Sequence, residues 1–299
     1  MMNAPCFSIV ICSINPMKFA EASEMYESLL AGLPHEIIGI HDARSLAEGY
    51  NRGLLQAHGD IVVFSHDDIL ILDPDFARKI STRLQDFDIL GFAGTRRLIS
   101  EYWWTAGLPW ISGVMASTHG TSINLSVWNI DPWPVVDGIQ AIDGLCIMAR
   151  RETVREIGFD ETTFDGFHLY DLDFSFSAWR AGKRLGVCCD IPVIHASSGN
   201  FGKTYQEYTR LFLAKHRNAL PCSSPPVSPP RGRATPAPDS RALIALWRRE
   251  SLQRSAIAQG LSHESGCLSP AFPEPSRLLT GQAQESPDDW KKSQKYGPR

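Results

Sequence analysis

The sequence predicts an α/β fold over residues 1–219, in which a mostly parallel sheet is flanked by helices, and a Pro-rich tail over residues 220–299. Short apolar segments rich in β-branched residues alternate with helical segments, which is typical of a parallel sheet with helical crossovers. Polar residues end three of the early strands. Twelve of the twenty prolines fall in residues 221–299, and prolines interrupt both helices and sheets.

The first half of the predicted domain has clear strand and helix signals. The continuous apolar run FSIVICS is typical of a strand buried on both faces, and the next segment has Pro16 near a helix start and Gly32 just past its end. In chain order, we expect a strand at 7–13, a helix at 16–31, a strand at 36–41, a helix at 45–59 and a strand at 60–65.

The second half begins with a segment of different character. Residues 101–134 contain five tryptophans interleaved with glycines and polar residues, which favours loops and antiparallel strands. After it we expect a strand at 144–150, a helix from 151, a helix at 171–181 and a last strand that ends within 191–199.

The tail is predicted to be a linker or largely disordered. One island within it, residues 240–259, has apolar residues at helical spacing. It predicts a short amphipathic helix, or one that forms only transiently.

Composition limits the function classes. A hydrophobic fraction of 43% and a charged fraction of 21% are typical of a globular protein, and a net charge of −4 does not predict a nucleic-acid surface. The seven cysteines include no CxxC pair, which argues against a zinc knuckle or a secreted disulfide framework. With no apolar run near 18 residues and no basic, apolar leader, we expect a cytoplasmic protein without a transmembrane segment. Peripheral membrane contact stays open.

Polar residues gather where three of the predicted strands end: Ser13-Ile14-Asn15, His41-Asp42 and His66-Asp67-Asp68. Ligands of parallel sheets bind beyond the carboxyl ends of the strands. Two carboxylates at the end of a buried strand repel each other and lose hydration, so they need a partner. A metal ion or a polar ligand is therefore expected there.

Two longer blocks carry a family resemblance. YNRGLLQAHGDIVVFSHDD (50–68) has an Asn-Arg-Gly segment, a helix, Ala-x-Gly-Asp, a strand and an acidic end, and YDLDFSFSAWRAG (170–182) has two aspartates at a helix start. In their order and spacing, over roughly residues 7–200, they resemble the glycosyltransferase family 2 type, inverting enzymes with a Rossmann-like GT-A fold. The resemblance implies a hexosyltransferase-type enzyme that moves a sugar from a UDP- or GDP-linked donor to a hydroxyl acceptor such as a glycan or a lipid-linked or small molecule.

The resemblance also implies a divalent cation, Mn²⁺ or Mg²⁺, that neutralises the leaving diphosphate. The family's Asp-x-Asp metal motif falls on His66 and Asp68, so the first acidic position is a histidine here. Asp68 is the expected direct ligand, and Asp67 assists through hydrogen bonds or a water. His66 either ligates Mn²⁺, donates to a phosphate or ribose, or is a structural strand-end residue. His195 resembles a histidine that completes the metal shell in some GT-A enzymes.

The second block resembles the family's Glu-Asp-x-Asp segment, which assigns the catalytic base to Asp171 and puts Tyr170 where the glutamate is expected. Asp173 is the alternative base or a residue that holds Asp171, and Asp171 alternatively only caps the helix. Asp143-Gly144 and His168 are expected near the acceptor. The residues expected to contact the donor nucleotide are Ser13, Asn15, Asp42, Arg44, Asn51 and Asp67.

Other function classes remain open. A His-Asp pair like His66-Asp67 also binds the metal in HD-type phosphohydrolases. In those enzymes the pair lies on a helix, whereas in this chain it ends a predicted strand. A nucleotidyltransferase would need a glycine-rich, lysine-containing loop after FSIVICS. A non-catalytic nucleotide-sugar or carbohydrate-binding module derived from a degenerate transferase is the alternative from another class.

Overall fold

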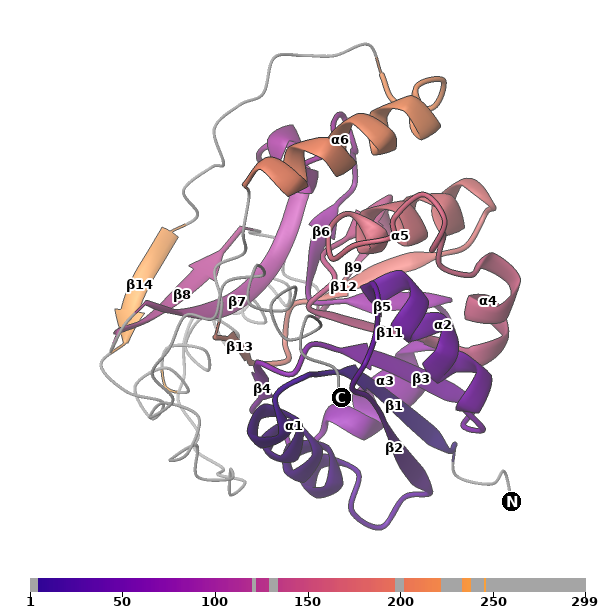
Figure 1. The fold of residues 1–299 in the computed structure, drawn as a ribbon. Coiled ribbons are helices and arrows are strands. Elements are labelled where there is room, and N and C mark those ends of the chain that lie inside the picture. The colour runs from indigo at the N-terminus through magenta and orange to yellow at the C-terminus, as the bar shows by residue number, and fades with distance from the viewer. Residues whose placement is uncertain are drawn as a thin grey trace.

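A computed structural model describes residues 5–119, 122–128, 134–196, 202–221, 233–237 and 245 of the chain. Its architecture confirms the predicted α/β class: a seven-stranded sheet lies between two layers of helices, and a second sheet packs beside it (Figure 1).

The sheet between the helix layers, here the central sheet, is mostly parallel. Its order is β2-β1-β3-β11-β5-β12-β9. The strands are β1 (Phe7–Cys12), β2 (His35–Ile40), β3 (Ile61–Ser65), β5 (Ile89–Gly91), β9 (Val135–Ile139), β11 (Cys146–Arg150) and β12 (Leu185–Cys188). Only β11 and β9 run against the other five.

Helices cover both faces of the central sheet (Figure 1). The core on one face includes residues of α1 (Pro16–Leu29) and α3 (Phe76–Arg83), and the core on the other includes residues of α2 (Leu46–Gln56), α4 (Arg151–Ile157) and α5 (Tyr170–Arg180). Alternate residues of β1 serve the two cores, since Val10 packs on the second and Phe7, Ile9 and Ile11 pack on the first. This two-sided burial explains the continuous apolar run of the strand.

Local sequence signals explain the first helices. Asn15 caps α1, because its Oδ1 accepts hydrogen bonds from the backbone N–H groups of Met17 and Lys18 at 2.9 and 3.2 Å, and Pro16 is the first helical residue. Ser45 caps α2 by accepting from the N–H of Glu48 at 3.0 Å. The predicted strands and helices of residues 7–65 are thus confirmed.

The second sheet has the order β10-β6-β7-β13-β4, with β8 beside β7 and β14 beside β8. Its strands are β4 (Ile69–Ile71), β6 (Ala93–Thr95), β7 (Ile111–His119), β8 (Ser122–Val127), β10 (Ala141–Ile142), β13 (Val193–His195) and β14 (Arg233–Ala237). β7 and β8 are antiparallel, as the glycine-interleaved tryptophan segment predicts. That segment also forms the short 3-10 helix η1 (Trp103–Ala106).

β11 confirms the strand expected at 144–150, for which no direction was predicted, and it pairs antiparallel with both β3 and β5. The cause is its connection, which arrives from the second sheet at the edge where β3 ends rather than through a helical crossover. As a result the start of β11 meets the end of β3, and the N–H of His66 donates to the carbonyl of Leu145 at 3.1 Å.

Helix α6 (Lys203–His216) and the strand β14 were not predicted. Within the predicted tail the structure describes only Leu220, Pro221, β14 and Ala245, so the proposed helix at 240–259 lies outside the described residues except for Ala245. β14 differs from the expectation of a tail without sheet structure. It contains Pro236, which edge strands tolerate because a strand edge leaves N–H groups unpaired.

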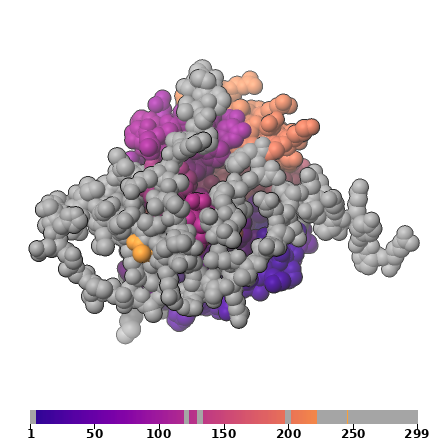
Figure 2. All heavy atoms as spheres, turned by 90° about the vertical axis from the view of Figure 1, so that its left-hand side faces the viewer, coloured from indigo at the N-terminus to yellow at the C-terminus, as the bar shows by residue number. Residues whose placement is uncertain are grey.

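Seen from the left-hand side of Figure 1, the orange residues of α6 and the purple residues around η1 lie together at the top of the molecule (Figure 2). Tyr102, which precedes η1, stacks on Tyr205 of α6 with ring centroids 5.3 Å apart. In the described part of the chain, no helix has both the length and the apolar character needed to cross a bilayer.

Candidate active site

The segment His66-Asp67-Asp68 links the two sheets, since it leaves β3 of the central sheet and enters β4 of the second. β4 pairs antiparallel with β13, and this register sets His195 opposite Ile69. The N–H of Ala196 also donates to the carbonyl of Asp68 at 2.9 Å. His195 therefore reaches the predicted metal motif from a strand more than 120 residues later in the chain.

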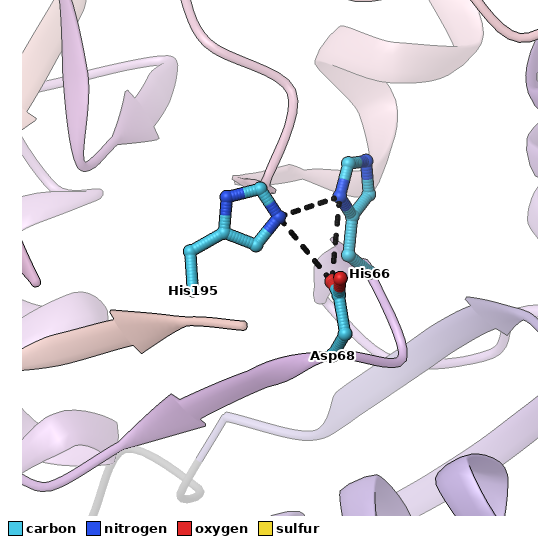
Figure 3. A group of neighbouring side chains, drawn as sticks. All are labelled: His66, Asp68 and His195. Carbon is cyan, nitrogen blue, oxygen red and sulfur yellow. Dashed lines mark hydrogen bonds and ion pairs between the residues drawn. The ribbon is translucent and has the colours of Figure 1, made fainter. Parts of the chain in front are cut away.

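His66, Asp68 and His195 point toward one another (Figure 3). His195 Nε2 lies 3.3 Å from Asp68 Oδ1 and 3.5 Å from His66 Nδ1, and His66 Nδ1 lies 3.9 Å from Asp68 Oδ1. Among the described residues, these three are the group of His, Cys, Asp or Glu side chains whose ligand atoms, all within 4.8 Å of one another, suit a metal ion. Two imidazole nitrogens and one carboxylate oxygen fit Mn²⁺ or another transition ion better than Mg²⁺, which prefers oxygen ligands.

The two histidines differ in electrostatics. Burial lowers the pKa of His66 below its ordinary value, because desolvation disfavours the imidazolium. Burial acts on His195 in the same direction, but the hydrogen bond and charge of Asp68 outweigh it and raise the pKa of His195. Without a metal, His66 is thus the neutral member of the cluster, and His195 shares its proton with Asp68.

Asp67 turns toward the end of β1, where its Oδ2 accepts a hydrogen bond of 2.6 Å from the hydroxyl of Ser13. Burial raises the pKa of Asp67, the Ser13 hydrogen bond opposes that rise, and the charge of Asp68 adds to it. Two predicted donor-binding residues therefore lie together beside the cluster.

Tyr170 connects the cluster to α5. Its buried hydroxyl lies 2.9 Å from His66 Nε2 and donates to the carbonyl of Gly144 at 3.3 Å. Position 144 needs a glycine, because Tyr170 and Asp171 pack closely against its backbone. A Cβ atom there would lie 2.5 Å from the Tyr170 hydroxyl and 2.6 Å from Cβ of Asp171.

Asp171 lies in the first turn of α5 against Gly144. Burial, and then the charge of Asp143, raise the pKa of Asp171 to about 7, although backbone N–H groups of Leu172, Asp171 and Gly144 favour its ionised form. A carboxyl group that titrates near neutrality has the proton affinity of a general base.

Asp143 is held in place by two hydrogen bonds. Its Oδ2 accepts from the indole N–H of Trp103 and its Oδ1 from the N–H of Leu145, both at 3.1 Å. The sequence-predicted pair Asp143-Gly144 thus lies beside Asp171.

Asp173, the alternative base, lies away from the cluster. It is 2% exposed, and its carboxylate accepts from His216 Nε2 at 2.7 Å and from Lys215 Nζ at 2.9 Å. Both partners belong to the end of α6, so the structure gives Asp173 a role in joining α5 to α6.

The other predicted nucleotide contacts are more scattered. Asn15 caps α1 as described above. Asp42 is 80% exposed and pairs with Arg52, whereas the exposed Arg44 pairs with Glu48 at 3.7 Å. The charge of Arg52 lowers the pKa of Asp42.

Asn51 is engaged within the protein. Its amide donates to the carbonyl of Phe159 at 2.9 Å and to Glu161 at 2.8 Å, and its Oδ1 accepts from the N–H of Phe159 at 3.1 Å. Since both ends of the amide are used, Asn51 holds the loop after α4, and we assign it a structural role in place of the predicted donor contact.

An aromatic group borders Asp171 on the side of α6. The rings of His168 and Tyr102 each lie 5.3 Å from that of Tyr205, and Trp104 lies 5.1 Å from Tyr102. Burial, and then the charge of Asp171, raise the pKa of Tyr205.

Sequence reasoning missed three features of this site: the contact of Tyr170 with His66, the effect of Asp143 on Asp171, and the partners of Asp173. The first carried a signal, because Tyr170 and His66 are the two positions that depart from the family motifs. The last carried none, because α6 was not expected.

Comparison with known proteins agrees with this architecture. The model of the "Glycosyltransferase like family" matches residues 8–216. No curated protein matches the chain.

The solved structures that the chain matches include three of low sequence identity and low TM-score. The mannosyltransferase PcManGT from Pyrobaculum calidifontis, in complex with GDP-Man and Mn²⁺, is 14% identical over 88% of this chain and 77% of its own, with a TM-score of 0.45. S. aureus TarS 1–349 in complex with UDP-GlcNAc is 15% identical over 71% and 67%, with a TM-score of 0.40. A197 from STIV is 12% identical over 64% and 86%, with a TM-score of 0.37.

The family match includes β3 with its His-Asp-Asp end, β11, the first turn of α5 and β13, which are all the elements that build the site. It ends at His216, the last residue of α6. The chain belongs to the Glycosyltransferase like family.

Proposed function

We propose that the chain is an inverting glycosyltransferase that moves a sugar from a nucleoside-diphosphate-sugar donor to a hydroxyl acceptor, with Asp171 as the base and a divalent cation at His66, Asp68 and His195. One observation carries the proposal: a chain of contacts runs from a group that could hold a metal to a carboxyl group of raised pKa. His66 lies beside Asp68 and His195 and contacts the hydroxyl of Tyr170. That hydroxyl donates to Gly144, against which Asp171 packs.

The donor diphosphate would lie at the edge of the central sheet where β1 and β3 end. When bound there, a divalent cation neutralises the charge of the leaving diphosphate. Asp68, His66 and His195 would hold the cation, and Ser13 with Asp67 would line the same edge. Because the ligand set contains two imidazoles, we expect Mn²⁺ to bind more tightly than Mg²⁺.

The acceptor would lie between Asp171 and the aromatic group of Tyr102, Trp104, His168 and Tyr205. Aromatic faces suit the apolar faces of sugar rings. Asp171 would take the proton of the attacking hydroxyl as the new bond forms, on the face of the anomeric carbon opposite the leaving diphosphate. We leave Asp173 out of this chemistry, because Lys215 and His216 already occupy its carboxylate.

The proposal is tested by metal and donor binding together with turnover. Calorimetry should detect Mn²⁺-dependent binding of a nucleoside diphosphate to the wild type and lose it in Asp68→Ala, while Asp60→Ala, a carboxylate outside the site, should bind as the wild type does. Equal affinity of wild type and Asp68→Ala would exclude the metal role.

Turnover separates an enzyme from a binding module. A panel of UDP- and GDP-sugars, screened with Mn²⁺ for donor hydrolysis and for transfer, should show activity that Asp171→Asn reduces at least about 100-fold. Binding of a donor without turnover, in both wild type and Asp171→Asn, would favour the non-catalytic module instead.

A further inference from the structure

The two positions at which the chain departs from the family's motifs are in contact. His66 replaces the first acidic residue of the metal motif and Tyr170 replaces the glutamate before the base, and although 104 residues separate them, Nε2 of His66 lies 2.9 Å from the hydroxyl of Tyr170. We infer that Tyr170 is a positioning residue, whose hydroxyl holds His66 in the tautomer with hydrogen on Nε2 and so presents the Nδ1 lone pair to Asp68 and His195. The inference rests on the proposed function, in which His66 is a metal ligand.

The hydrogen-bond inventory leads to this tautomer. Tyr170 has one hydroxyl hydrogen, and the Gly144 carbonyl, 3.3 Å away, can only accept. When the hydroxyl donates to Gly144, its oxygen has lone pairs left for His66, so Nε2 of His66 must carry a hydrogen. A neutral imidazole, the form that ligates a metal, carries one hydrogen, so Nδ1 of His66 is then unprotonated.

The other side of His66 fits the same assignment. His195 Nε2 lies 3.3 Å from Asp68 Oδ1 and 3.5 Å from His66 Nδ1, so the hydrogen on His195 points at the carboxylate and not at a second N–H group. Nδ1 of His66 therefore faces the ligand atoms as an acceptor, which is the form that binds a metal.

Packing restrains the tyrosine. The residue is 4% exposed, and its ring packs edge-on against Tyr50 and at a tilt against Phe159, with ring centroids 5.6 and 6.3 Å apart. Leu169, directly before it, has a φ of 60°, which is uncommon for a residue with a branched side chain and persists only where the surroundings hold the turn. The hydroxyl can thus rotate its hydrogen but not leave His66.

The pair also suits its buried position. A tyrosine and a neutral imidazole form one hydrogen bond without net charge, whereas two carboxylates in hydrogen-bond contact would repel each other unless a cation lay between them. Loss of a partner that orients a ligating histidine typically costs about 10- to 100-fold in metal affinity.

The first measurement determines the tautomer of His66 in metal-free protein. Two-bond ¹H–¹⁵N correlation spectra of ¹⁵N-histidine protein, with the His66 signals assigned by their loss in His66→Ala, should show hydrogen on Nε2 of His66 in the wild type. Tyr170→Phe, which keeps the ring and removes the hydroxyl, should shift His66 toward a mixture of tautomers.

The second measurement is the Mn²⁺ affinity by calorimetry, in a double-mutant cycle of Tyr170→Phe and His66→Ala. Tyr170→Phe should weaken Mn²⁺ binding about 10- to 100-fold in the wild-type background and less than about twofold in His66→Ala, since a residue that acts through His66 has no effect without it. Tyr26→Phe, which removes another fully buried hydroxyl on α1, should leave the Mn²⁺ affinity unchanged.

Two results would overturn the inference: hydrogen on Nδ1 of His66 in the wild type, or a Tyr170→Phe effect of equal size in both backgrounds, which is that of a merely structural residue. If the wild type binds no Mn²⁺, the metal-assisted function fails, and the tautomer of His66 alone decides whether Tyr170 positions it.

Discussion

Asp171 lies under opposing influences at a single carboxyl group. It is in the first turn of a helix, where the helix dipole and three backbone N–H groups favour its charge, yet burial and Asp143 oppose that charge more strongly. Tyr170 and Tyr205 stay neutral near neutral pH, since burial raises their pKa values and the charge of Asp171 adds to the rise.

We predict that the transfer rate rises with pH through about 7 and levels off above it, because only ionised Asp171 accepts the proton of the acceptor. Asp143→Asn removes the neighbouring charge and should move this rise to lower pH by roughly one unit. Initial rates of both proteins across pH 5.5–9 measure it, and a rise at the same pH in both would contradict the role of Asp143.

A stability measurement tests the same pKa without turnover. A folded-state pKa of about 7, above the ordinary 3.8, means that the folded protein binds this proton more tightly than the unfolded chain does, so stability falls as pH rises toward and through 7. Asp171→Asn removes the cost, and it should raise the melting temperature more at pH 8 than at pH 4. An equal effect at both pH values would mean that Asp171 titrates as an ordinary carboxyl group.

At the residue scale, the sequence singles out His66, Asp68, His195 and Asp171 because each occupies a strand end or a motif position, and the structure brings the first three together. It could not predict the contact between His66 and Tyr170, since residues 104 apart meet only through tertiary packing. For Asn51 the motif position could not predict the partner that the structure shows, because the same amide chemistry that suits a nucleotide also suits the backbone of Phe159.

At the scale of elements, α5 and α6 are joined by a buried polar contact. Asp173 on α5 accepts from His216 and Lys215 at the end of α6, and Lys215 also pairs with Asp160 at 2.7 Å. The helix that carries the proposed base is thus held from a segment beyond β13.

His216→Leu should lower the free energy of unfolding by about 3 kcal/mol, because it leaves a buried carboxylate with one partner fewer. Urea unfolding measures it, with Arg210→Ala, on the exposed face of α6, as a control that should change stability by less than about 0.5 kcal/mol. The double variant Asp173→Leu/His216→Leu should recover most of the loss, since apolar pairs replace buried ion pairs well. A double variant less stable than the single one would contradict this account of the contact.

The elements predicted correctly are those with complete local signals, such as the two-sided apolar run of β1 and the caps of α1 and α2. β4, β5 and β6 have only three residues each, too few for a periodicity to develop. The direction of β11 has no local signal, because it depends on which edge of the sheet the preceding chain enters.

On the scale of the whole molecule, the buried residues that the structure describes in both hydrophobic cores all precede residue 220. Among the described residues, the cores and the apolar side chains packed against them end at Leu220. β14 adds backbone pairing to β8 at the outer edge of the second sheet.

A chain that ends at Pro221 should therefore unfold in one cooperative thermal transition and retain Mn²⁺ binding. Differential scanning calorimetry of this shortened chain, beside the full chain, measures the transition. Loss of the cooperative transition would show that residues beyond 221 complete a core, and would move the predicted domain boundary.

The passage of the chain from one sheet to the other at residues 66–68 has a consequence for the order of events in a catalytic cycle. His66 and Asp68 lie in the connection from β3 to β4, while His195 ends β13, so a cation bound by all three fastens the second sheet to the central one. The second sheet leads through β7 to η1 and the aromatic group proposed for the acceptor. Binding of the donor with its cation would therefore stabilise the acceptor side of the site before an acceptor binds. We expect steady-state kinetics of a compulsory order, in which the donor binds first and the acceptor second.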